Sequence, residues 1–92
     1  MLLKAITNGS VTGNGTISCV STICGGVLIT TDGTNAVTVV VRRLDANGKK
    51  IIQIVSDSTI WISGPFSLEG TEQLYHEVSG TGGAAQFFEW VT

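Results

Sequence analysis

The chain has 92 residues, a formal net charge of -2 and only 13% charged residues. This length is that of one domain, residues 1–92, which buries only about 60–65% of the surface exposed by its unfolded chain. The five basic residues form no stripe along which a phosphate backbone could lie, which argues against nucleic-acid binding. No apolar run approaches the ~18 residues of a membrane span, and the apolar start is too short for a signal-peptide core. We therefore expect folding in a cytoplasm.

The composition predicts an all-β protein. Val, Ile and Thr supply 31 residues and Gly another 12, and β-branched side chains favour strands while glycines favour turns. Apolar residues recur with period two or run continuously, with no helical period. The spacing predicts a small antiparallel β-sandwich, or partly closed barrel, of seven to eight strands. The expected strands are 2–7, 15–22, 27–30, 36–44, 49–55, 58–63, 73–79 and 84–91, with a brief extended segment at 66–68.

Local signals place the turns. Residues 36–44 precede Asp45-Ala46-Asn47-Gly48, and an Asn-Gly pair supplies the positive φ angles of a hairpin turn. A β-branched residue at Gly48 should therefore destabilise the hairpin. Gly25-Gly26, inside an apolar run, predicts a bulge or a bend that switches sheets. Asn8 should end the first strand before a loop at 11–15, and Gly64-Pro65 should stop strand pairing.

Groups that could support catalysis or metal binding are few. The single histidine, His76, alternates with Leu74 and Val78 on an apolar face, where a core or interface role is expected. No nucleophile elbow, zinc-protease or phosphate-loop motif occurs. The aspartates lie in or near turns, whereas a calcium site would need clustered acids. We expect no enzymatic activity, no cofactor and no metal.

Two cysteines, Cys19 and Cys24, lie five positions apart. With one distant histidine they cannot complete a zinc site. Buried free thiols are the main interpretation and a disulfide is the alternative, since a disulfide needs an oxidising compartment.

The aromatic residues carry most information about function. In the last strand Phe87 and Val91 should face one way, and Phe88 and Trp90 the other. An antiparallel sheet with one face in water should show clean alternation of apolar and polar residues. Both faces of this strand should therefore be covered, by a closed barrel or loop, or by another subunit, where Trp and Tyr are enriched.

Residues 39–48 (VVVRRLDANG) and 75–84 (YHEVSGTGGA) carry a resemblance to a known group. A strand ending in a D-x-x-G hairpin, followed late in the chain by an E-V-S-G-T-G turn before the last strand, resembles small β-sandwich proteins of tailed bacteriophage particles. The resemblance covers Gly33 onward and does not extend to Cys19, Cys24 or Gly25-Gly26. It implies a structural role and homo-oligomers, often trimers.

Two functions of different class follow. The first is a non-enzymatic decoration or cement protein of the phage head, or else a neck, tail or fibre component, located in the virion. Its partners would be copies of itself and the major capsid protein or other virion proteins. The candidate contact residues are Arg42, Arg43, Trp61, Tyr75, Phe88 and Trp90.

The second function is a carbohydrate-binding module with Trp61, Tyr75 and Trp90 as a stacking platform. The direction of the aromatic side chains discriminates between the two: rings aligned on one exposed face favour sugar binding, and rings buried between chains favour assembly.

Overall fold

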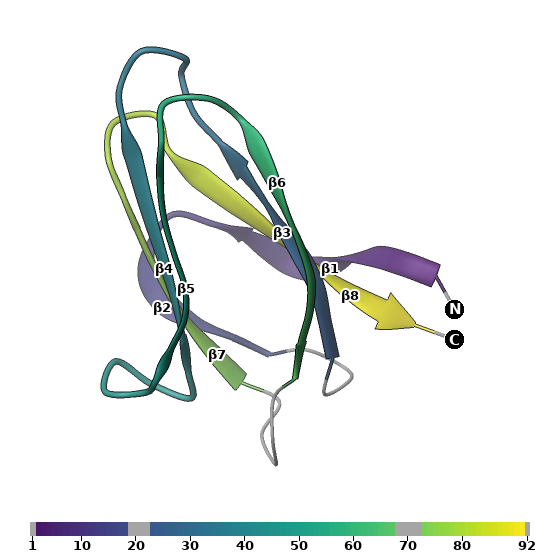
Figure 1. Ribbon diagram of the computed structural model, residues 1–92. Helices are drawn as coiled ribbons and strands as arrows, with labels where there is room; N and C mark the ends of the chain where they lie inside the picture. The colour runs from purple at the N-terminus through teal and green to yellow at the C-terminus, as the bar shows by residue number, and fades with distance from the viewer. Residues whose placement is uncertain (1, 19–22, 68–72, 92) are drawn as a thin grey trace.

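The computed structural model describes residues 2–18, 23–67 and 73–91 (Figure 1). Within these ranges the chain forms eight strands, confirming the expected all-β class, and no helix that could cross a membrane. The strands are β1 (Leu2–Val11), β2 (Gly13–Ser18), β3 (Ile23–Thr30), β4 (Val37–Arg43), β5 (Lys50–Ser56), β6 (Ile60–Ser67), β7 (Gln73–Ser79) and β8 (Ala84–Val91).

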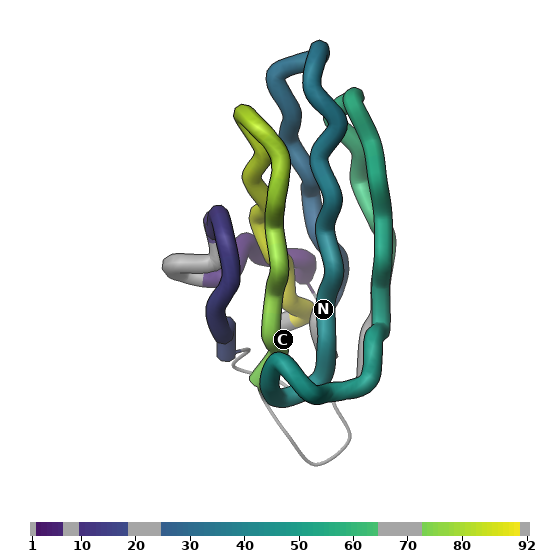
Figure 2. Tube along the Cα trace, turned by 90° about the vertical axis from the view of Figure 1, so that its left-hand side faces the viewer, coloured from purple at the N-terminus to yellow at the C-terminus, as the bar shows by residue number. Residues whose placement is uncertain are grey.

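The strands form two four-stranded antiparallel sheets. Sheet A has the order β1-β8-β3-β6, and sheet B the order β2-β7-β4-β5, whose strands lie side by side in Figure 2. The pairs are nested: β4 pairs with β5, β3 with β6, β2 with β7 and β1 with β8. A long hairpin folded over in this way, with two sheets packed face to face, has the strand order of a jelly roll.

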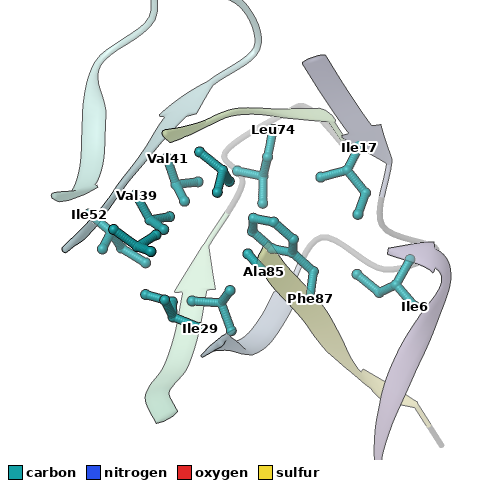
Figure 3. Close-up of a cluster of buried hydrophobic side chains, with 12 residues drawn as sticks. Ile6, Ile17, Ile29, Val39, Val41, Ile52, Leu74, Ala85 and Phe87 are labelled. Carbon is teal, nitrogen blue, oxygen red and sulfur yellow. The ribbon is translucent and has the colours of Figure 1, made fainter. Parts of the chain in front are cut away.

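The core lies between the two sheets. Val37, Val39 and Val41 share the inner face of β4, as their alternation predicts, and all three are fully buried. Opposite them Phe87 of β8 is the largest fully buried side chain. Figure 3 shows side chains of both sheets converging on this ring, including Ile6, Ile17, Ile29, Ile52, Leu74 and Ala85.

Several predicted boundaries were wrong. β1 continues past Asn8 to Val11, with an irregular register between Ala5 and Ser10, and only Thr12 separates it from β2. β6 continues as a strand through Gly64-Pro65 to Ser67; its register with β3 skips these two residues, as the sequence predicts, and resumes at Phe66. It can do so because β6 is an edge strand, where a proline is tolerated.

The glycine pair marks a bulge and not a change of sheet. β3 runs through Gly25-Gly26 and keeps β6 on one side and β8 on the other, with a shift in register between Cys24 and Gly26. The pairing state of Cys19 and Cys24, and a turn that the sequence also predicts at Glu69-Gly70, lie outside what the structure describes.

The β4–β5 hairpin is where the sequence predicts it, but its turn is different. The Gly48 N–H donates to the Asp45 carbonyl (2.9 Å), and the Asn47 N–H donates to the Asp45 carboxylate (2.9 Å). Neither Asn47 nor Gly48 has a positive φ; the residue that does is Leu44, at 69°. Asp at the first position and Gly at the fourth suit a type I turn, so the expected positive φ at Asn47-Gly48 was wrong.

The strain of this hairpin therefore sits at Leu44. The Asp45 N–H donates to the Arg43 carbonyl (2.8 Å) around Leu44, which makes a tight three-residue turn of a rare kind. Gln73 of β7 holds Leu44 from both sides: its carbonyl accepts from the Leu44 N–H (3.2 Å) and its side-chain amide donates to the Leu44 carbonyl (2.7 Å). These two bonds compensate for the unfavourable backbone.

We predict that Gly48→Val lowers the free energy of unfolding by about 2 kcal/mol or more, because a Cβ at Gly48 would lie 1.6 Å from the Arg43 carbonyl oxygen. Asn47→Ala, one residue away and exposed, should change stability by less than about 0.5 kcal/mol. Urea denaturation measures both. Equal midpoints for Gly48→Val and wild type would contradict this turn geometry.

Candidate interaction surface

The outer face of sheet A carries a cluster of large apolar side chains, beside polar Ser63 and Gln86. We call this cluster the aromatic face; its members are Leu3, Leu28, Trp61, Phe88 and Trp90. Their backbones are in register across the sheet, with Leu3 opposite Trp90 and Leu28 opposite Trp61. Opposite residues of an antiparallel pair point to the same face, so the five side chains share one surface. Because the inner face of the same sheet lies against the core, sheet A carries large apolar side chains on both sides.

Two glycines form the floor of this surface. A Cβ at Gly25 would lie 2.3 Å from Leu3 Cδ1 and 3.3 Å from the indole of Trp90. A Cβ at Gly26 would lie 2.6 Å from Trp61 Cζ2, and 2.7 Å from the Ile62 carbonyl oxygen. The indoles of both tryptophans therefore lie close to the backbone of β3, where any side chain would displace them. The Gly25-Gly26 bulge is what allows the aromatic rings to lie low over the sheet.

The rings are also packed against one another. Trp61 and Phe88 meet edge to face, with ring centroids 5.2 Å apart and planes at 80°. This geometry stabilises by about 0.5–1.5 kcal/mol beyond the burial of area. Phe88 and Trp90 are half-buried, whereas Trp61 and Leu3 are each 41% exposed. The face is thus a preformed apolar surface that still offers a large indole and an aliphatic side chain to a partner.

The remaining candidate contact residues lie on sheet B. Tyr75 of β7 is opposite Arg42 of β4, on the other sheet from Trp61 and Trp90. The three rings therefore do not form one stacking platform. Arg42 Nε donates to Glu77 Oε1 at 2.5 Å, with both side chains partly buried, so its charge is paired within the molecule. Arg43 ends β4 and is half-buried opposite Leu74.

Two polar side chains lie in the interior. His76 is 4% exposed, its Nδ1 lies 3.0 Å from the Gly13 carbonyl, and its ring packs near Phe87; the expected core role is confirmed. Glu89 is 3% exposed, which sequence reasoning missed. Glu89 lies two positions after Phe87, and residues two apart in a strand point to the same face. This spacing is the signal that could have predicted the burial of Glu89. No buried polar side-chain atom of the described residues lacks a hydrogen-bond partner.

Asp32 organises the loop between β3 and β4. Its Oδ1 accepts from the N–H groups of Asn35 (2.8 Å) and Thr34 (2.9 Å), and its Oδ2 accepts from the Asn35 amide (2.7 Å). These bonds, the one from the Asn35 N–H first, hold the pKa of Asp32 below its ordinary value of 3.8. Among the residues described, no three His, Cys, Asp or Glu gather where they could hold a metal ion.

Comparisons with known proteins leave the family open. Neither a scan against protein-family models nor searches of curated proteins and solved structures gave a significant match.

The lowered pKa of Asp32 predicts a pH dependence. The ionised carboxylate stabilises the fold, so this contribution is present above the pKa of the unfolded chain and is lost as pH falls through the lower folded value. Asp32→Asn should therefore lose stability relative to wild type at neutral pH, and the difference should shrink in acid. Urea midpoints measured from neutral pH to pH ~2 check this; a difference independent of pH would contradict it.

The glycine floor predicts a second effect. Gly26→Ala should destabilise the protein by about 1–3 kcal/mol and shift tryptophan emission to longer wavelength, because the added methyl group displaces the Trp61 indole. Gly33→Ala is the control, since Gly33 also has a positive φ, 84°, but nothing lies within 4 Å of its Cβ position. If both variants lose the same stability and keep the wild-type emission, the indole does not rest on Gly26.

Proposed function

We propose that this protein is a non-enzymatic structural component of a virus particle, a decoration or cement protein of a tailed-phage head, that works by packing against neighbouring protein. The observation that carries the proposal is the aromatic face: sheet A carries large apolar side chains on both sides, and its outer side exposes Trp61 and Leu3. A partner that covers these side chains gains apolar burial without ordering new chain.

The low charge of the chain supports the same function. Charged residues are 13% of the sequence, about half the ~25% share of an ordinary soluble domain, and a protein that stays monomeric usually keeps a charged surface. Interfaces that persist are depleted in charge at their centre and enriched in Trp, Tyr and Phe. The aromatic face has this composition.

The fold adds a weaker argument by analogy. The jelly roll occurs in viral capsid proteins and also in lectins, so it is compatible with both functions inferred from sequence. The resemblance of residues 39–48 and 75–84 to phage structural proteins favours the first. The separation of Tyr75 from the two tryptophans removes one ring from the sugar platform of the second.

The test compares two aromatic truncations on opposite sheets. Trp61→Ala should keep its β-rich circular dichroism but lose association with particles by about 2 kcal/mol or more, as expected when a partly exposed indole is a hot spot. Tyr75→Ala, on the outer face of sheet B, is the matched control and should bind like wild type. Co-sedimentation with purified particles of the source strain, quantified by mass spectrometry against the major capsid protein, measures both.

The outcomes separate the two functions. If the wild-type protein is absent from the particles and Trp61→Ala alters binding on a glycan array, the face binds sugar and the assembly function is wrong. If Trp61→Ala still binds particles fully, the aromatic face is not the interface.

A further inference from the structure

The four edge strands of the sandwich differ in how well they resist pairing with another strand. Exposed edges invite such pairing, and proteins block it with charges, prolines, glycines, bulges or short strands. β1 carries Lys4 and an irregular register, and β6 carries Pro65 and an irregular register against β3. β2 is six residues long with glycines at 13 and 15.

The β5 edge has almost none of these features. From Ile51 to Ser56 it contains no charge, no proline and no glycine. Its one irregularity is the extra residue Ile51 at its beginning, and Ile52–Ser56 pair residue by residue with β4. Val55 is 64% exposed, and Gln53 is also exposed. The edge is therefore regular, apolar and open, which is the combination that favours strand addition.

The sequence of β5 specifies the occupant. In an antiparallel pair of two β5 strands centred on Gln53, this residue faces its own copy, Ile52 faces Ile54, and Ile51 faces Val55. At the ends Lys50 faces Ser56, so no two like charges meet. The match of Ile52 with Ile54 lies on the inner face of the sheet, where both side chains pack on the core; Ile51 is the extra residue of the irregularity and also packs on the core, so it does not cover the exposed Val55. Cross-strand pairs such as Ile52 with Ile54 stabilise a sheet.

We propose that the β5 edge pairs antiparallel with the β5 edge of a second copy of this chain, about a two-fold axis at Gln53. The contact is closed, because each copy uses the same edge, and it joins two B sheets into one sheet of eight strands. It goes beyond the proposed function, since it involves neither the aromatic face nor a particle. The inner residues Ile52 and Ile54, already packed on the core, would then continue that core into the partner.

Charge at the axis gives a sharp test. Gln53→Lys and Gln53→Glu each place two like charges opposite one another in the pair, which should weaken self-association about tenfold or more. The monomer should tolerate both, because Gln53 is exposed and its side-chain oxygen accepts a hydrogen bond from Lys50 Nζ (2.9 Å) at the surface. An equimolar mixture of the two variants places opposite charges across the axis and should restore the dimer as a heterodimer.

The controls are Thr16→Lys and Thr16→Glu, which make the same charge changes on the exposed face of edge strand β2. Sedimentation equilibrium measures association, thermal melting confirms that each variant is folded, and hydrogen exchange should show concentration-dependent protection of β5 amides in wild type.

A wild-type protein that stays monomeric at high micromolar concentration would overturn the proposal. The proposal would also be wrong if the protein formed a trimer or an open-ended fibril that the Gln53 variants do not affect. It would be wrong as well if the Thr16 variants lost the dimer and the Gln53 variants kept it. The two proposals are tested separately. If Gln53→Lys binds particles at the wild-type level, the aromatic face functions without the β5 contact, so failure of one proposal does not imply failure of the other.

Discussion

The fold depends on apolar contact between sheets whose strands are mostly distant in sequence. The β4–β5 hairpin is the one connection that stays within a sheet; the others that the structure relates pass from one sheet to the other. No sheet can therefore form by successive hairpins. What holds the two together is the row of valines on β4 packed against Phe87 of β8, a contact that forms only when both sheets are in place. The edges and the aromatic face keep their geometry because this contact fixes the strands that carry them.

Alternation in the sequence predicted which side chains lie inside. It placed Val37, Val39 and Val41 on one face and separated Phe87 from Phe88, and the structure confirms both. It could not predict strand order, because a period of two tells which face is buried but not which strand is the neighbour. The turn at Asp45–Gly48 was located correctly but given the wrong geometry, since Asp at its start and Asn-Gly at its end are compatible with two turn types.

The aromatic face was only partly predictable. The sequence identified Trp61, Phe88 and Trp90, but grouped them with Tyr75, which strand order places on the other sheet. It also predicted a bulge or a bend at Gly25-Gly26, without indicating which of the two forms or what it is for. The reason appears only in three dimensions: the backbone of β3 passes beneath two indoles that come from β6 and β8. A contact between residues some 35 and 65 positions apart leaves no periodic signal in the chain.

The interior position of β8 has a consequence for biosynthesis. This strand lies between β1 and β3, yet it is the last of the eight described strands to be synthesised. Until it does, β1 has no neighbour in sheet A, and the core lacks Phe87. Sheet B can assemble earlier, because β2, β4, β5 and β7 all precede it. Until β8 is synthesised, the nascent chain therefore carries a half-built sandwich with an open apolar side.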